Sequence, residues 1–261
     1  GGTLNVAEVT VSTGAELNWN GGTLQETTGQ SPNILLNGGT LNYDSGAAWD
    51  YNGSMLIGDG GQLEMNGNGL NINSATSVIV GAGTNVVGAT STPGNITGAG
   101  EIRVGDTAPG YLEINSGSTV TNAATGGPYT AYVGYTAGAA GSSALVTGIG
   151  STWTTDGDFV VGEGGGGQLD IEAGGVVNAG QDGAVGAQTG VTGTVNITDL
   201  GSAWNIGRYL YVGGDGGGVG GTGVINLDDD GVLNVTNHTV LFANGTINQD
   251  DTTGPIPATT A

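Results

Sequence analysis

Short phrases in which apolar and polar residues alternate recur along this chain. Leu112-Glu113-Ile114 and Leu169-Asp170-Ile171 each place two apolar side chains on one side of a strand and an acidic one on the other. Successive side chains of a strand point to opposite faces, so each phrase predicts a short strand with one buried face. Apolar residues do not recur at three- and four-residue intervals, and each glycine inside a helix costs about 1 kcal/mol relative to alanine. We therefore expect almost no α-helix.

The phrases repeat at nearly constant spacing. The dipeptide Val-Gly recurs at intervals of 29, 28, 24 and 27 residues, beginning at Val104, Val133, Val161, Val185 and Val212. A glycine-containing loop and an alternating strand follow several copies, and Ile57-Gly58 followed by Gly61-Gln62-Leu63-Glu64-Met65 is interpreted as an earlier copy. A unit of this length cannot bury a core alone, so the repeats predict a solenoid in which each unit stacks on the next.

Two further periods extend the pattern. Trp153 and Trp204 lie 51 residues apart, which predicts that both pack at equivalent structural positions, and Trp49 is assigned to the same position in a degenerate repeat. The phrase Gly-Gly-Thr-Leu begins at Gly1, Gly21 and Gly38, and its spacings of 20 and 17 residues also suit one turn of a solenoid. The repeats therefore extend into the N-terminal third.

These patterns predict an all-β chain that folds as a single-stranded parallel β-helix. At about 4.8 Å per rung, roughly 10–12 rungs would form a rod of about 50 to 60 Å. Gly, Asn and Asp would occupy the corners, because they tolerate positive φ. We expect the β-helix over residues 1–245, with the looser Gly-Gly-Thr-Leu repeats in 1–100 and the Val-Gly and Gly-x-Leu-x-Ile repeats in 101–245. Residues 246–261 would form an extended C-terminal tail.

Composition narrows the range of partners. The 261 residues include 57 Gly, no Cys, 23 acidic residues and two basic ones, for a net charge of −21. Such a surface repels phosphate, so nucleic acid and anionic membranes are not expected partners. No run approaches the roughly 20 apolar residues of a spanning helix, and signal-peptide features are missing. We therefore interpret the sequence as a mature or trimmed chain without a membrane span.

Groups suited to catalysis are few and scattered. A lyase acting on uronates needs a cation and a base near the substrate carboxylate, but Arg103 and Arg208 occupy different places relative to Val-Gly. Hydrolysis of a glycoside needs two carboxylates at a defined separation. The candidate carboxylates instead fall in glycine-rich turns: Asp156, Asp158 and Glu163. We expect no enzymatic activity, no catalytic residue and no required cofactor.

The densest acidic cluster is Asp228-Asp229-Asp230, which precedes Gly231, and Asp250-Asp251 follows near the end. Adjacent oxygens in a turn can bind Ca²⁺, yet neither a calcium-roll repeat nor an EF-hand loop occurs. The sequence therefore allows two interpretations of Asp228, Asp229 and Asp230: a calcium site or a solvated turn. His238 has no Ser or Cys motif as a partner and is expected to be a surface or turn residue.

Several phrases in residues 100–236 share the form of one repeat. They are residues 146–153 (Val-Thr-Gly-Ile-Gly-Ser-Thr-Trp), Val161-Gly162, residues 167–171 (Gly-Gln-Leu-Asp-Ile) and residues 174–177 (Gly-Gly-Val-Val). This repeat resembles the one shared by type V secretion passengers and PEP-CTERM surface proteins, and the Gly-Gly-Thr-Leu phrases are similar to strand repeats of autotransporter passengers. The resemblance implies a secreted bacterial β-helix at the cell surface and carries over no catalytic residue. Residues 254–261 lack the Pro-Glu-Pro core of a PEP-CTERM signal.

We therefore expect a non-enzymatic extracellular structural protein. Copies would assemble into a surface filament or matrix by end-to-end stacking or strand exchange, with divalent cations relieving the repulsion between acidic chains. The alternative is an adhesin or passenger domain that binds glycans or other surfaces through tyrosines. Alternation in Tyr209-Leu210-Tyr211-Val212 places both tyrosines on the face opposite Leu210 and Val212, so one of these pairs faces outward. A second group of tyrosines comprises Tyr129, Tyr132 and Tyr135.

Overall fold

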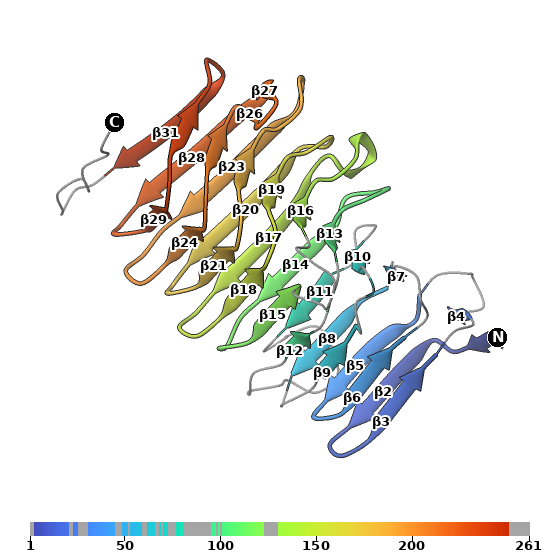
Figure 1. The fold of residues 1–261 in the computed structure, drawn as a ribbon. Helices are drawn as coiled ribbons and strands as arrows, with labels where there is room; N and C mark the ends of the chain where they lie inside the picture. The colour runs from blue at the N-terminus through green and yellow to red at the C-terminus, as the bar shows by residue number, and fades with distance from the viewer. Residues whose placement is uncertain are drawn as a thin grey trace.

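The computed structural model describes residues 3–20, 23–25, 31–44, 49–51, 53–58, 62–65, 68, 70–72, 77–80, 95–97, 99, 101–122 and 130–250. In this part of the chain the backbone winds through three parallel sheets, turn after turn, as a β-solenoid (Figure 1). Its only helix there is the single 3₁₀ turn η1 (Ala137–Ala139). The predicted fold class, a parallel β-helix with almost no α-helix, is confirmed.

The three sheets run along the length of the rod. Sheet 1 contains β2 (Glu8–Ser12), β5 (Asn33–Asn37), β8 (Met55–Gly58), β11 (Ser77–Val80), β14 (Tyr111–Ile114), β17 (Ser142–Thr147), β20 (Gly167–Glu172), β23 (Thr192–Ile197), β28 (Thr222–Asp228) and β31 (Gly245–Asp250). Sheet 2 contains β3 (Glu16–Trp19), β6 (Thr40–Tyr43), β9 (Gln62–Glu64), β12 (Asn95–Thr97), β15 (Thr119–Asn122), β18 (Thr152–Thr155), β21 (Val176–Ala179), β24 (Ala203–Ile206) and β29 (Val232–Val235).

Sheet 3 closes the cross-section. It contains β7 (Trp49–Tyr51), β10 (Leu70–Ile72), β13 (Ile102–Val104), β16 (Ala131–Val133), β19 (Phe159–Val161), β22 (Gly183–Val185), β25 (Leu210–Val212) and β30 (Thr239–Leu241). Outside these sheets, β1 (Thr3–Asn5) pairs with β4 (Thr23–Gln25), and β26 (Gly214–Asp215) forms an antiparallel hairpin with β27 (Gly218–Val219).

The solenoid is shorter than the sequence predicts. Among the described residues the sheets contain ten, nine and eight strands, and about seven turns separate the first and last strands of sheet 3. Ten strands at a spacing of about 4.8 Å span roughly 43 Å. Sheet 1 therefore reaches the lower end of the expected 10–12 rungs, and the expected length of about 50 to 60 Å was too high. Strand β31 ends at Asp250, so residues 246–250 belong to sheet 1. Residues 251–261 lie outside the described part.

The Val-Gly repeat marks one position of the turn. Its five valines stand opposite one another in successive strands of sheet 3, from Val104 to Val212, and all five are fully buried. The alternating phrases form the matching column of sheet 1, where Leu112, Leu169 and Ile225 point into the core. The predicted repeat unit is therefore one turn.

Two N-terminal assignments were wrong. Ile57-Gly58 lies in β8 of sheet 1 and Gln62-Leu63-Glu64 forms β9 of sheet 2, whereas the Val-Gly valines lie in sheet 3. Thr3 does pair with Thr23, as the 20-residue spacing predicts, but Thr40 pairs with Glu16 in sheet 2. The reason is that glycine corners precede the strands of both sheet 1 and sheet 2, so the phrase does not identify the face.

Aromatic side chains fill the core at particular turns. Trp153 and Trp204 occupy the same inward column of sheet 2, separated by Val177, and Phe159 contacts both rings at centroid distances of 4.7 and 6.1 Å. The 51-residue period is therefore two turns. Trp49 instead lies in β7 of sheet 3, so its assignment to the same position was wrong.

The glycines of Val-Gly are required by the corner between sheets 3 and 1. All five have φ between +70° and +82°, a region that residues with a Cβ rarely adopt. The backbone of the next turn also passes close by: a Cβ on Gly186 would lie 2.2 Å from the carbonyl oxygen of Thr222. The dipeptide therefore places a buried valine directly before a corner residue that has no room for a side chain.

Alanine at Gly186 should destabilise the solenoid more than alanine at Gly190. Both glycines have positive φ, +70° and +84°, but nothing lies within 4 Å of a Cβ at Gly190. Gly190→Ala should therefore cost only the conformational term of about 1–2 kcal/mol. Gly186→Ala must also displace the neighbouring turn and should cost at least about 1 kcal/mol more. Urea unfolding followed by circular dichroism measures both, and equal losses would contradict the steric account.

Candidate functional site

The acidic cluster forms a corner between sheets 1 and 2. Asp229 and Asp230 have φ of +48° and +67°, and the Gly231 amide donates a 2.9 Å hydrogen bond to the Asp228 carbonyl. Aspartate is among the few residues that adopt positive φ readily, which gives the cluster a structural role. Within the described ranges, no group of three His, Cys, Asp or Glu side chains is placed to hold a metal ion. Calcium binding at Asp228, Asp229 and Asp230 therefore stays a prediction.

The two arginines lie on the outer face of sheet 3, far from each other. Arg103 in β13 forms an ion pair with Glu101 and a second with Asp106 at 3.5 Å. Arg208 precedes β25, four strands along the sheet, where its Nη1 donates to Gln181 Oε1 at 3.1 Å and its Nε lies 3.8 Å from Asp182. At about 4.8 Å per strand the two turns are roughly 19 Å apart. The structure does not bring the arginines together.

Two of the three carboxylates considered for hydrolysis, Asp158 and Glu163, accept hydrogen bonds from neighbouring turns. Asp158 Oδ1 accepts a 2.9 Å hydrogen bond from the Asp182 amide, and Asp182 Oδ1 accepts one of 3.1 Å from the Tyr209 amide. Glu163 Oε1 accepts a 2.9 Å hydrogen bond from the Gln188 side chain. His238 is exposed, with its ring centroid 5.6 Å from that of Tyr209. These groups link successive turns of the solenoid.

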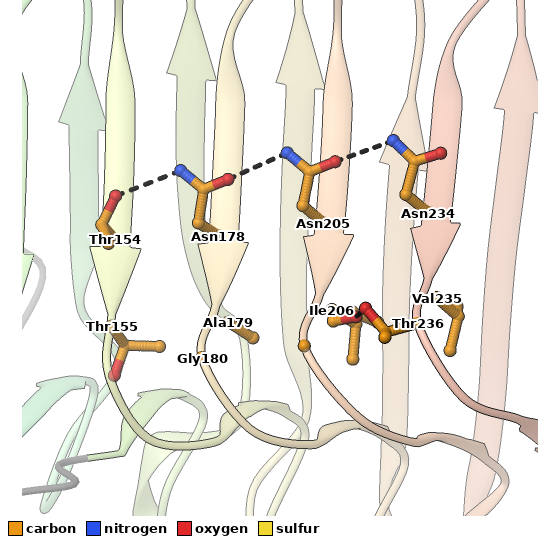
Figure 2. Close-up of a pocket in the computed structure, with 11 residues that line it drawn as sticks. Thr154, Thr155, Asn178, Ala179, Gly180, Asn205, Ile206, Asn234, Val235 and Thr236 are labelled. Atoms are coloured by element: carbon orange, nitrogen blue, oxygen red, sulfur yellow. Dashed lines mark hydrogen bonds between the residues drawn. The ribbon is translucent and has the colours of Figure 1, made fainter.

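A ladder of amide side chains crosses the outer face of sheet 2 (Figure 2). Asn178 donates from Nδ2 to Thr154 Oγ1 at 3.1 Å, Asn205 donates to Asn178 Oδ1 at 2.9 Å, and Asn234 donates to Asn205 Oδ1 at 2.8 Å. Each asparagine is in register with the next, so every bond joins adjacent turns. The ladder adds side-chain hydrogen bonds to the backbone bonds that hold the turns together.

A second ladder runs along the outer face of sheet 1. Asn196 donates to Asp170 at 2.6 Å, Asn226 to Asn196 at 2.7 Å, and Asn248 to Asn226 at 2.8 Å. Neither ladder was expected from the repeat phrases. Their signal is the asparagine that follows an apolar residue in successive repeats, as in Val177-Asn178 and Trp204-Asn205.

A shallow groove of about 500 Å³ lies beside the ladder of sheet 2, where its strands end (Figure 2). It is lined by Thr154, Thr155, Asn178, Ala179, Gly180, Asn205, Ile206, Gly207, Asn234, Val235 and Thr236. These side chains are amides, hydroxyls and small apolar groups, and none is an acid, a base or a thiol. The groove therefore offers hydrogen bonds to a ligand but no general acid or base.

The outer face of sheet 3 is different, because tyrosines gather there. Tyr132, Val160, Ala184 and Tyr211 form one outward column over four successive strands. Both tyrosines pack against the apolar group formed by Val160, Ala184 and Ala187. We call this column, together with Ala187, the tyrosine strip.

The tyrosine hydroxyls of this strip stay protonated to high pH. Burial, with a smaller contribution from the charge of Glu101, raises the pKa of Tyr132 to about 12. Burial and then the charge of Asp182 also raise the pKa of Tyr211. Both groups are therefore neutral hydrogen-bonding hydroxyls at physiological pH.

No family model, curated protein or solved structure matches this chain. The resemblance to secreted bacterial β-helix repeats therefore rests on the repeat phrases themselves. The described part of the chain contains no helix that is long and apolar enough to cross a membrane. What the structure defines is a parallel β-solenoid with two amide ladders and one face bearing tyrosines.

Removing a central amide of the sheet 2 ladder should cost more stability than removing its last one. Asn205→Ala breaks two hydrogen bonds, whereas Asn234→Ala breaks the one to Asn205. At about 0.5–1.5 kcal/mol per bond, the expected losses are roughly 1–3 and 0.5–1.5 kcal/mol. Urea unfolding of the two variants measures the difference. Equal losses, or a larger loss for Asn234→Ala, would contradict the expectation that stability follows the number of ladder bonds broken.

The raised pKa of Tyr132 predicts a loss of stability at alkaline pH. Its folded pKa of about 12 exceeds the reference value of 10.0, so the stabilisation is complete below pH 10 and is lost as the pH rises to about 12. Absorbance at 295 nm should show tyrosine ionisation near pH 12 in the folded wild type, and Tyr132→Phe should remove one tyrosine from this late component. In urea all tyrosines should ionise near pH 10. A wild-type titration with no late component would refute the assignment.

Proposed function

We propose that this protein is a non-enzymatic structural rod whose copies associate end to end into an extracellular filament or matrix. The observation that carries the proposal is the match between its two end strands. In the described part of the chain β2 and β31 are the first and last strands of sheet 1, at opposite ends of the rod, and each pairs with a single neighbour (Figure 1). A strand with an unpaired edge is a template for pairing with another chain.

The apolar pattern of the two edges agrees in one of the two inward columns of sheet 1; the other column begins at Val11 and ends at Gln249. Val9 of β2 and Ile247 of β31 begin and end one inward column of sheet 1, which also includes Leu112 and Leu169. Both end residues are partly buried against the core. Parallel stacking of β31 on β2 of a second copy would place Ile247 against Val9, so the column would continue across the joint.

The helical path of the chain supports a role for strand exchange in the same joint. At the C-terminal end, sheet 1 extends one strand further than sheet 2, because β31 begins a new turn after β29. At the N-terminal end the two sheets begin in the same turn, with β2 and β3. Stacking β31 on β2 would therefore leave β29 and β3 two strand spacings apart, with room for one more strand in sheet 2. Leu233 and Val235 of β29 are partly exposed at that position. A strand supplied by a neighbouring copy would cover them.

Charge at the two ends makes association depend on cations. The first strands carry Glu8 and Glu16, and the opposite end carries Asp228-Asp229-Asp230 and Asp250. Bringing these ends together adds repulsion to that of a net charge of −21 per copy, and ions screen or bridge it. The location outside the cell rests on the resemblance to secreted bacterial repeat proteins.

Association should be disrupted by a charge inside the proposed joint. Ile247→Lys places an ammonium group in the inward column at the last strand, whereas Thr246→Lys adds the same charge to the outward side of the same strand. Sedimentation velocity at high protein concentration in Ca²⁺ should show polymers for the wild type and Thr246→Lys, and monomers for Ile247→Lys. Wild-type protein that stays monomeric with and without Ca²⁺ would refute the proposal.

A further inference from the structure

The tyrosine strip differs from an ordinary exposed strand face, because its outward apolar residues are covered by aromatic rings. Val160 and Ala184 point outward from the sheet, yet they are only 7% and 6% exposed. They are covered because Tyr132 and Tyr211 pack against the same apolar group from the turns on either side. The three strand spacings from β16 to β25 give the strip a length of roughly 14 Å.

Each end of the strip is supported by a second aromatic ring. The ring of Tyr135 meets that of Tyr132 edge to face at a centroid distance of 4.7 Å, and the Arg103 guanidinium lies 3.8 Å above Tyr135. At the other end Tyr209 lies 6.2 Å from Tyr211. These contacts restrict the rings, so little side-chain entropy is left to lose when a ligand stacks on them.

Carboxylates surround the strip on both sides. Asp158 and Asp182 precede β19 and β22 at one edge, and Glu163 follows β19 at the other. The nearby Arg103 and Arg208 are each engaged with acidic neighbours. The potential over the strip is therefore negative, which disfavours acidic ligands such as uronates or phosphates.

We infer that the tyrosine strip binds an uncharged, extended polysaccharide, with pyranose rings stacked on Tyr132 and Tyr211. A pyranose ring has an apolar C–H face that packs on an aromatic ring, and its hydroxyls lie around the rim where the strip presents carboxylates and tyrosine hydroxyls. A β-1,4-linked chain is flat and extended, so it can follow three turns of the solenoid. This inference goes beyond the proposed assembly and does not depend on it.

Affinity electrophoresis in native gels tests the inference, with EDTA present to keep the protein unassembled. Glucomannan and hydroxyethylcellulose serve as neutral β-1,4-linked probes and polygalacturonate as the acidic one. The wild type should be retarded by the neutral polymers only. Tyr132→Ala and Tyr211→Ala should each weaken retardation at least several-fold, and Tyr132→Phe should retain it because the ring remains.

Tyr111→Ala supplies the matched control. Tyr111 is a half-buried tyrosine on the outer face of β14 in sheet 1, and its hydroxyl donates to Glu113 Oε2 at 3.0 Å. This variant should be retarded as strongly as the wild type. Three results would overturn the inference: no retardation by either neutral polymer, equal weakening by Tyr111→Ala, or equal retardation by polygalacturonate. Circular dichroism of each variant verifies that the fold is retained.

Discussion

The constraint on which this structure depends is the fixed register of parallel strands stacked at about 4.8 Å. Once the register is set, each position of the turn recurs as a column along the rod. The Val-Gly valines form one inward column, their glycines form a corner column at positive φ, and asparagines form two outward ladders. A side chain is therefore selected by its neighbours above and below as much as by its own strand.

Much of the fold could be predicted because the repeat and the turn coincide over residues 101–245. The spacing of Val104, Val133 and Val161 equals the spacing of strands in sheet 3, so periodicity alone gave the correct unit. It failed near the N-terminus, where Thr40 follows a Gly-Gly corner on a different face. The amide ladders could not be predicted from one asparagine, because their stabilisation arises only when Asn178 and Asn205 are placed in register.

The columns of equivalent residues also explain why a self-associating structural rod is proposed. In the described part of the chain, carboxylates such as Asp158 and Asp182 accept hydrogen bonds from the next turn. Two features face outward instead. The edges of β2 and β31 lie at the ends, where another copy can extend the core, and the tyrosine strip lies along one side. A filament with these properties would display the strip once in every subunit.

Negative-stain electron microscopy of the wild-type protein, with Ca²⁺ and then with EDTA, tests the central claim most directly. End-to-end association predicts unbranched fibres of constant width in Ca²⁺ that separate in EDTA into short rods of roughly 43 Å, the length spanned by ten strands. Isolated short rods in both conditions, even at high protein concentration, would contradict end-to-end association.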